Sequence, residues 1–556
     1  MYEGGKFQPY LMPLNRLEGP HIELPQLIAY MKFEVMGDYV KYLDRLKQIP
    51  TSLYQVIDLL KEGIKTKILP PAVGLESVGD QLEASVKALD GDGKKSPLWR
   101  SCPKSATSTS ECEALEKQVS IVLTTVVKDA YIALKNFVVD VYVKELSNIR
   151  GKSVACLELP NGAKMYEACL KFHIGSVKSA KEVHQIGLNE VARITKEMKT
   201  ACIACGMPSD GNVKEYLNKL NEDERFIAKT EKELVAYYRD VCMAIYPNLP
   251  NLFSINCMPR TPYSVIATPA AQAEQAPAAY YLGGAGDGTR AGTFYINTSV
   301  LPERPTYYAE SLSLHEAIPG HHTQTMLAAE NQDLPNFRRF MDDRRYSEAP
   351  GRYPIDGAFI EGWGLYSEAL GADLGCYTDP HQLVGRLNME MFRSCRLVVD
   401  TGLHAFGWTV QQAKDYMLLN TCSSETDIDA EVKRYCTWPG QATGYKMGEL
   451  EIWRLRKRFE AMLPNESIRN FHDIILLQGS LPLCVIEEVL EEYIAKKTST
   501  TPIVATTGPS KKTGPLDGAE DVSASDLSNA FSFGVGLGVG LAILIAVVSV
   551  THPKAR

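Results

Sequence analysis

The sequence carries little that would bind nucleic acid or direct the chain to secretion. Its 67 acidic residues outnumber its 59 basic residues, for a net charge of -8, and no basic stripe with interleaved aromatic residues is present. Because phosphate recognition needs clustered Lys and Arg, nucleic acid is excluded as a partner. Residues 1–25 lack the basic start and the continuous apolar run of a signal peptide. They are typical of the middle of a folded domain.

Two further motifs are incomplete. The glycine-rich stretch 280–297 is followed neither by Gly-Lys-Ser/Thr nor by the start of a helix, which excludes a phosphate loop. Cys202 and Cys205 have the CxxC spacing, but no second CxxC accompanies them. This pattern favours a structural pair or free thiols over a metal or redox site.

The chain does have an unusual density of histidine at one place. Three of its ten histidines, His315, His321 and His322, lie within eight residues of one another. His315 is followed directly by Glu316, as in the zincins, where neutral imidazoles ligate zinc and the adjacent carboxylate acts as the general base. The alternative interpretation is a helix end with ordinary hydrogen-bonded histidines.

The spacing of these histidines differs from the usual HExxH pattern. On an unbroken helix, two histidines four residues apart are about 40° apart in angle and about 6 Å apart along the axis. His321 follows His315 by six residues and lies on another face, whereas His322 follows by seven and lies about 10.5 Å along the axis. Pro319 and Gly320 can end or bulge the helix and bring a later histidine back. A metal site here therefore requires a break, which the sequence supplies.

A second stretch offers a third ligand. Glu361 and Glu368 are seven residues apart within 359–369, which places both on one face of a helix. A catalytic zinc typically takes three protein ligands and keeps a fourth position open. Glu361 would complete a His, His, Glu set, and Glu368 would accept a hydrogen bond from a ligand histidine. An exposed helix face is the alternative for either glutamate.

These stretches resemble the domain of unknown function 885 family. The resemblance rests on HEAIPGHHTQ from His315, EGWGLYSE from Glu361, RLVVDTGLHAFGWT at Arg396–Thr409 and RYCTWPGQATGYKMG at Arg434–Gly448. Weaker similarity extends over most of residues 5–495. The family is regarded as zincin-like, mostly helical and similar to the gluzincin metallopeptidases. The resemblance therefore implies a metal-dependent hydrolase, without naming a substrate.

The family pattern HExxPGHxxQ also implies which histidine binds the metal. It matches His321 rather than His322, and it matches Gln324 as well. Family members generally carry more sequence before a segment similar to PYLMPLNRLEG at 9–19, so the resemblance implies a shortened N-terminus in this chain.

A polar pair and a histidine follow the metal motifs. Arg396 and Asp400 are four residues apart, which predicts an ion pair along one helix. The alternative is a functional role, in which Arg396 or His404 faces the active-site cleft.

The last candidates flank a Pro-Gly pair. Tyr445 is the favoured hydrogen-bond donor to an oxyanion, because a phenol stays protonated at neutral pH. Arg434 or Lys446 would hold a carboxylate of the substrate. For each of these residues, a core or surface role is the alternative.

Helical periodicity dominates the chain, most clearly in 26–95 and from Cys112 to about Arg150. The polar segment 91–113 contains Cys102 and Cys112, which indicates an exposed loop closed by a disulfide.

The predicted fold is mainly α, a zincin-like helical metallopeptidase domain over residues 1–496. We expect a small β element beside the active-site helix, because the glycine-rich stretch ends in a strand at 293–296, just upstream of His315. The edge of this strand would pair with an extended substrate.

The composition changes after residue 496. Residues 497–529 are rich in Thr, Ser, Pro and Gly without periodicity, which predicts a disordered stalk. Residues 530–550 are uncharged and mostly apolar, which predicts a transmembrane helix. Residues 551–556 form a short basic tail. GxxxG spacings within 534–540 indicate a homodimer through this helix, with loosely packed glycines as the alternative.

These features predict a single-pass membrane protein with a C-terminal anchor. The basic tail favours an extracellular or lumenal catalytic domain. The alternative is a tail-anchored protein whose main domain faces the cytosol. Sequons beginning at Asn297 and Asn465 are compatible with a glycoprotein.

Together the patterns predict a membrane-anchored, zinc-dependent hydrolase, preferably a peptidase acting on a peptide or small amide. His315, His321 and Glu361 would bind Zn²⁺. Glu316 would take the proton of the attacking water, and Tyr445 would share the oxyanion. Two other classes remain open: an amidase or esterase for small molecules, and a catalytically silent surface receptor or adhesion protein on the same fold.

Overall fold

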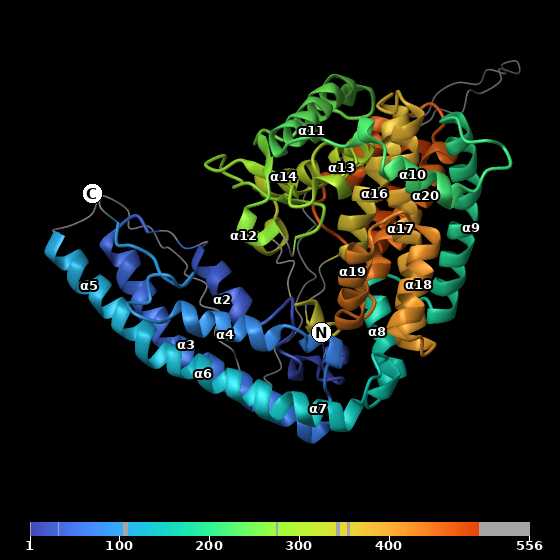
Figure 1. Ribbon diagram of the computed structural model, residues 1–556. Helices are drawn as coiled ribbons and strands as arrows, with labels where there is room; N and C mark the ends of the chain where they lie inside the picture. Colours follow the sequence, from blue (N-terminus) through green and yellow to red (C-terminus); the bar gives the residue numbers. More distant parts are fainter. Residues whose placement is uncertain are drawn as a thin grey trace, which may run out of the picture. The chain divides into compact units, whose positions relative to one another are not determined.

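Helices build most of this protein, as the computed structural model shows (Figure 1). The structure describes residues 2–29, 31, 33–103, 109–273, 276–340, 345–352 and 356–499. In the helix α3 (Met36–Thr66), Tyr39, Leu46 and Leu53 belong to a stripe of buried residues spaced three, four or seven apart. This spacing buries one side of a helix and leaves the other side to solvent. The mainly helical prediction agrees with the structure.

The N-terminal helices, apart from the short first one, share one core. They are α1 (Tyr2–Gly5), α2 (Pro20–Ala29), α3, α4 (Val78–Ala88), α5 (Thr109–Val122), α6 (Lys128–Phe137) and α7 (Val143–Arg150). Two π-helical segments, Leu123–Val127 and Val138–Tyr142, join α5, α6 and α7 into one long helix. Buried apolar residues of α3, α4 and α6 pack together in this core. The predicted disulfide is present between Cys102 and Cys112.

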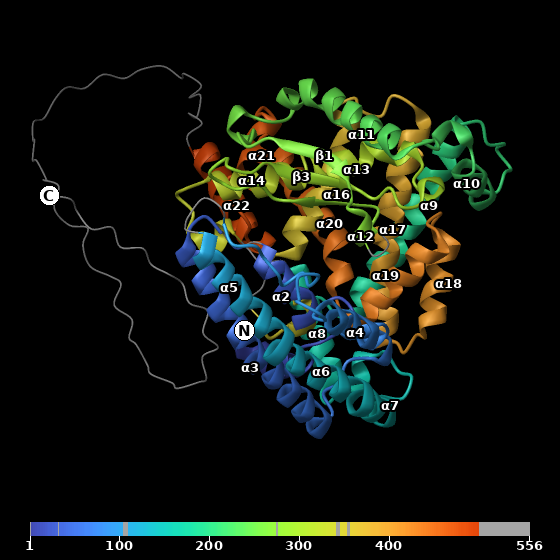
Figure 2. The same ribbon diagram turned by 60° about the vertical axis from the view of Figure 1, so that its left-hand side comes forward.

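The remaining helices follow along the chain from residue 162 (Figure 2). They are α8 (Gly162–Ile174), α9 (Ala180–Ala204), α10 (Val213–Asn221), α11 (Glu231–Ile245), α12 (Ala270–Ala273), α13 (Ala309–Glu316), α14 (His321–Glu330), α15 (Asn336–Arg339), α16 (Gly357–Asp373), α17 (Pro380–Ala405), α18 (Val410–Asn420), α19 (Glu425–Thr437), α20 (Gly444–Met462), α21 (Ile468–Leu476) and α22 (Leu483–Ser499). The most extensive packing pairs α9 with α17 and α16 with α20.

A three-stranded sheet lies beside the helices α13 and α14. Its strands are β1 (Tyr263–Ala267), β2 (Ala279–Leu282) and β3 (Gly292–Ile296), in the order β1-β3-β2. β3 is parallel to β1 and antiparallel to β2. The predicted strand at 293–296 is therefore present, but its predicted free edge is wrong, because neighbours on both sides occupy its backbone hydrogen bonds. The edge strand that contacts α13 and α14 is β2.

The predicted transmembrane helix is corrected by the structure. Across the described ranges, no helix combines the length and the apolar character that crossing a bilayer requires. α22 extends to Ser499, so the first residues of the predicted stalk are helical. The rest of the stalk, the predicted span 530–550 with its GxxxG face and the tail 551–556 lie outside the described residues. The fold is accordingly a mainly helical domain, and neither the membrane anchor nor the dimer built on it is retained.

One of the two sequons is closed to modification in the folded chain. Asn297 is 1% exposed, and its side-chain amide donates to the carbonyls of Ala273 and Ala276. A glycan on this nitrogen would replace one of its two hydrogens and so break at least one of these hydrogen bonds. Asn465, in the other sequon, is exposed.

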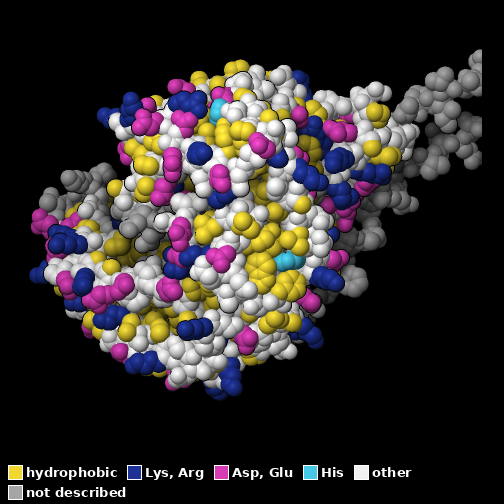
Figure 3. Space-filling view, turned by 45° about the vertical axis from the view of Figure 1, so that its right-hand side comes forward, with side chains coloured by type: hydrophobic (Ala, Val, Ile, Leu, Met, Phe, Trp, Pro, Cys, Tyr) yellow, Lys and Arg dark blue, Asp and Glu magenta, His cyan; other side chains and the backbone are white. Residues whose placement is uncertain are grey.

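Charges of both signs are interspersed over the face drawn in Figure 3. No basic stripe crosses this face, in agreement with the net charge of -8.

Candidate metal centre

The break predicted at Pro319 and Gly320 separates two helices. α13 ends at Glu316 and α14 begins at His321. A Cβ atom on Gly320 would lie 1.8 Å from the carbonyl oxygen of His315, so only glycine fits where the chain turns. The indole Nε1 of Trp363, on α16, donates a 2.8 Å hydrogen bond to the carbonyl oxygen of Pro319. The turn is therefore held from the helix that carries the third candidate ligand.

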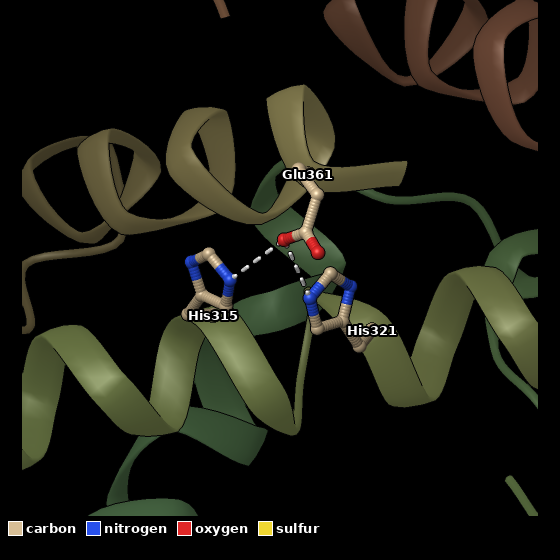
Figure 4. A group of neighbouring side chains, drawn as sticks. All are labelled: His315, His321 and Glu361. Carbon is tan, nitrogen blue, oxygen red and sulfur yellow. Dashed lines mark ion pairs between the residues drawn. The ribbon is translucent and has the colours of Figure 1, made fainter. Parts of the chain in front are cut away.

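Three side chains converge at this break: His315, His321 and Glu361 point toward one another (Figure 4). Their candidate ligand atoms all lie within 4.8 Å of one another. The Oε2 atom of Glu361 is 3.6 Å from Nε2 of His315 and 3.4 Å from Nε2 of His321. The two imidazole rings are nearly perpendicular, with centroids 4.7 Å apart.

This donor set fits a tetrahedral zinc ion. Ligand atoms about 2.0–2.1 Å from one zinc are about 3.4 Å apart in a tetrahedron, close to the observed 3.4 and 3.6 Å. Two neutral imidazoles and one carboxylate are also a set that catalytic zinc sites use. Within the described residues, this is the cluster whose spacing suits a metal ion.

The orientation of His315 is fixed by a second carboxylate. Nδ1 of His315 donates to Oε1 of Glu368 at 2.8 Å, which leaves Nε2 directed at the cluster. The hydroxyl of Ser311 donates to the other oxygen of Glu368 at 2.6 Å. A Cβ atom on Gly364 would lie 2.6 Å from the His315 ring, so this glycine makes room for the imidazole. Hydrogen bonds of this type set the tautomer and the basicity of a ligand histidine.

The histidines and carboxylates of the cluster shift one another's pKa values. Burial lowers the pKa of His315, but the Glu361 and Glu368 carboxylates outweigh burial and raise this pKa to about 9. Burial likewise raises the pKa of the Glu361 carboxyl, but His315 and His321 hold it well below its usual range. The cluster therefore holds a carboxylate charge that would favour a bound cation.

His322 and Gln324 lie outside the cluster. Nδ1 of His322 is 2.8 Å from the hydroxyl of Tyr281, and the Tyr263 ring packs against the imidazole at 4.6 Å. Burial lowers the pKa of His322 to about 4, so this imidazole is neutral. The amide of Gln324 donates to the carbonyl of Phe359 at 3.2 Å and ties α14 to α16. Of the two neighbouring histidines, His321 is the one brought to His315 and Glu361.

Glu316 and Tyr445 lie near the cluster. Glu316 is 8% exposed, and its charge acts on His315. Burial raises the pKa of Tyr445, and the Glu361 carboxylate raises it further, so the phenol keeps its proton. Tyr445 lies near Glu361 because α16 and α20 cross at glycines: a Cβ atom on Gly362 would lie 2.4 Å from the backbone of Gly448.

The predicted ion pair of Arg396 with Asp400 is wrong. Arg396 donates through Nη2 to Glu431 at 2.7 Å and through Nε to the hydroxyl of Tyr435 at 2.8 Å. Its guanidinium carbon lies 4.5 Å from the centre of the Tyr445 ring. Asp400 instead accepts from the hydroxyl of Tyr166 at 2.6 Å. Spacing along one helix could not reveal these partners, because they come from other helices.

The side chains of Arg434 and His404 form hydrogen bonds with other groups of the chain. Arg434 donates to Glu431 and to Gln441, at 2.7 Å each. His404 is fully buried, with Nε2 donating to a backbone carbonyl at 2.9 Å, and burial lowers its pKa to about 4.

Lys446 is a buried cation of the core. It is 1% exposed, and its ammonium lies 2.6 Å from Glu390, 2.7 Å from Glu449 and 3.0 Å from Glu190. The predicted role of Lys446 in holding a substrate carboxylate is therefore wrong, because three carboxylates of the chain already surround it.

Four residues that contact the predicted residues or the turn between them were not predicted: Ser311, Gly364, Trp363 and Tyr281. Ser311 is four residues before His315 and could have been found from helical spacing. Gly364 and Trp363 lie inside the EGWGLYSE stretch, but nothing in the local spacing distinguishes them from residues of the helix core. Tyr281 carries no signal in the sequence, because its contact with His322 depends on how the sheet packs.

Comparisons with known proteins place the chain among proteins of unestablished function. The family model described as "Bacterial protein of unknown function (DUF885)" matches residues 2–490. None of the curated proteins matches the sequence. A solved structure titled as the "putative lipoprotein from Colwellia psychrerythraea" is 30% identical with a TM-score of 0.77, and the match covers 87% of this chain and 81% of that one.

A second solved structure shows the fold alone. It is titled as "a putative lipoprotein of unknown function from Shewanella oneidensis", is 18% identical and has a TM-score of 0.58. The match covers 83% of this chain and 82% of that one. Both titles name lipoproteins. The predicted localisation, a single-pass protein with a C-terminal helix, is corrected by these findings together with the lack of a membrane-crossing helix in the described ranges.

Proposed function

The chain belongs to the DUF885 family, whose function is unknown, and we propose that the protein is a zinc-dependent hydrolase of the zincin type that acts on peptides. The observation that carries this proposal is the convergence of His315, His321 and Glu361 at a turn that only glycine permits. A glutamate directly follows the first of these histidines. When bound, zinc would polarise the scissile carbonyl and lower the pKa of water.

Three residues of the chain would carry out proton transfer, oxyanion stabilisation and ligand orientation. Glu316 takes a proton from the attacking water and returns it to the leaving amine. Tyr445 donates a hydrogen bond to the carbonyl oxygen as negative charge develops there, because its phenol stays protonated. Glu368 holds the imidazole of His315 in one orientation.

The sheet favours a peptide over a small amide or ester. In an antiparallel pair the residues alternate between those bonded to the partner strand and those directed away from it. The backbone nitrogen of Asn297 donates to the carbonyl of Ala278, so the next bonded residue along β2 is Tyr280. The backbone groups of Ala279 and Tyr281 therefore face the outer edge of the sheet. Within the described residues, no backbone hydrogen bond uses that edge. An extended peptide added there would lie beside α13 and α14.

The decisive experiment combines metal analysis with turnover. Purified protein should contain about one zinc per chain, His321→Ala should lose it, and His322→Ala should keep it. Glu316→Gln should keep zinc and lose at least about a hundredfold in kcat on a peptide library. Full activity in Glu316→Gln, or unchanged zinc in His321→Ala, would refute the proposal. Parallel assays with small amides and esters decide between the substrate classes.

A further inference from the structure

Arg396 is a buried cation that lies against the ring of Tyr445. Arg396 is on α17 and is 5% exposed, and its guanidinium carbon is 4.5 Å from the centre of the Tyr445 ring on α20. The rings of Phe392 and Tyr435 lie 4.8 and 5.5 Å from the same carbon. Three aromatic rings therefore surround one guanidinium. A cation within about 6 Å of a ring centre is attracted to the face of that ring, most strongly where water is excluded.

The guanidinium of Arg396 is itself held in place by α19. One of its nitrogens donates to Glu431 and another donates to the hydroxyl of Tyr435. That hydroxyl donates in turn to Glu431 at 2.8 Å. The three groups form a closed triangle of hydrogen bonds, so Arg396 cannot turn away from the ring of Tyr445 without breaking two of them.

A second arginine completes the surroundings of Tyr445. Arg434 donates to both oxygens of Glu431, at 3.0 and 2.7 Å. It also donates to Gln441 at 2.7 Å, and Gln441 contacts the hydroxyl of Tyr445. Glu431 is thus one carboxylate between two guanidiniums, which leaves positive charge in excess beside the phenol. This charge opposes the effect of the Glu361 carboxylate on the phenol and so favours the O–H group as a hydrogen-bond donor.

Tyr445 needs such support because of its place in the chain. It is the second residue of α20, and its side chain is partly exposed. A partly exposed side chain in the first turn of a helix has several rotamers available. A donor to an oxyanion, in contrast, is effective when it already points at the position where charge develops. The contact with Arg396 restricts the ring to one orientation.

We propose that Arg396 is a positioning residue for the proposed reaction, because its guanidinium holds the ring of Tyr445 so that the phenol donates to the oxyanion. The proposal rests on the proposed hydrolase function and deepens it. With 5% of its surface exposed, Arg396 acts through Tyr445 and not by binding the substrate. Loss of the guanidinium therefore lowers kcat, and only while the hydroxyl of Tyr445 is present.

A double-mutant cycle tests this dependence on a fluorogenic peptide that the zinc-loaded full chain cleaves. Arg396→Met should lower kcat about three- to thirtyfold, with KM and zinc content nearly unchanged. In the Tyr445→Phe background the same substitution should change kcat by less than about twofold, because the hydroxyl that Arg396 positions is gone. Arg396→Lys keeps the charge without the planar stacking surface and should restore part of kcat.

Arg456→Met is the matched control. Arg456 also lies over an aromatic ring, that of Trp453 at 5.0 Å, and pairs with Asp373. This variant should leave kcat unchanged in both backgrounds. If Arg396→Met lowers kcat equally in the two backgrounds, or has no effect in either, Arg396 supports only the fold, and the positioning role is overturned while the hydrolase stands. Full turnover in Tyr445→Phe has the same consequence.

The order of the ring separates the two proposals without turnover. With 3-fluorotyrosine at position 445, the fluorine NMR signal should broaden and move toward its position in the unfolded chain when Arg396→Met is added, but not when Arg456→Met is added. This change in a chain that hydrolyses no peptide supports the contact as the device that orients the ring and refutes the hydrolase. An unchanged signal in folded Arg396→Met refutes the positioning role, whatever the turnover.

Discussion

At the scale of single residues, the candidate site depends on side chains that touch no metal. Glu368 bonds both His315 and Ser311 and is 1% exposed, so it orients one ligand and cannot be replaced by solvent. We expect Glu368→Ala to lower zinc affinity by about ten- to a hundredfold, as loss of such partners does elsewhere. Competition with a fluorescent chelator measures this. Asp373→Ala, a change on the same helix, should leave the affinity as it is.

A second prediction at this scale concerns Tyr445. Tyr445→Phe removes the phenolic hydrogen bond to the developing oxyanion and the contact of the hydroxyl with Gln441, while the ring still packs on Arg396. We expect kcat to fall by about a hundred- to a thousandfold, with zinc content and KM nearly unchanged. If kcat falls less than threefold, the hydroxyl has no part in turnover.

Individual residues also show which contacts of the site the sequence could predict and which it could not. The sequence could predict that His315, His321 and Glu361 lie close together, because Pro319 and Gly320 indicate a break between two short helices. The partners of Arg396 and Lys446 were not predictable, because carboxylates from other helices meet these cations in the folded chain. Spacing within one helix reports only the neighbours on that helix.

At the scale of elements, glycines set the distances between helices. Gly320 lets the chain turn against the His315 carbonyl, and Gly448 lets α20 approach α16 so closely that a Cβ atom would lie 1.9 Å from the Ala358 carbonyl oxygen. The order of the strands, by contrast, depends on tertiary packing. The sequence therefore predicted the strand 293–296 but misplaced it at a sheet edge.

The corresponding prediction is that Gly320→Ala loses the metal while keeping most of the helix content. The added methyl group must move the turn away from His315, which separates the two histidines. Zinc analysis and far-ultraviolet circular dichroism measure the two effects. Gly37→Ala is the control, because a Cβ atom there would meet nothing within 4 Å. Full zinc occupancy in Gly320→Ala would show that the turn tolerates a side chain.

At the scale of the whole molecule, stability should depend on a buried carboxyl in α13. Burial raises the pKa of Glu310 to about 7, and this effect outweighs the hydrogen bonds from Gln382 and Tyr237, which favour the carboxylate. The protonated form is favoured in the fold. Its contribution is therefore complete below about pH 4.5 and is lost as pH rises through 7.

Glu310→Gln should remove this loss. We expect the variant to match the wild type at pH 4.5 and to exceed it at pH 8 by up to about 3 kcal/mol in the free energy of unfolding. Urea titrations of both proteins at the two pH values measure the difference. A variant equally destabilised at both values would mean that Glu310 acts through a hydrogen bond and not through its charge.

The hydrogen bond from Trp363 to Pro319 joins the ligand-bearing turn to the helix of the third ligand. We therefore expect the proposed zinc ligands to keep their positions when a chelator removes the ion. Binding and release of zinc would then be a reversible equilibrium without a refolding step. Cycles of depletion and reloading would then restore full turnover each time.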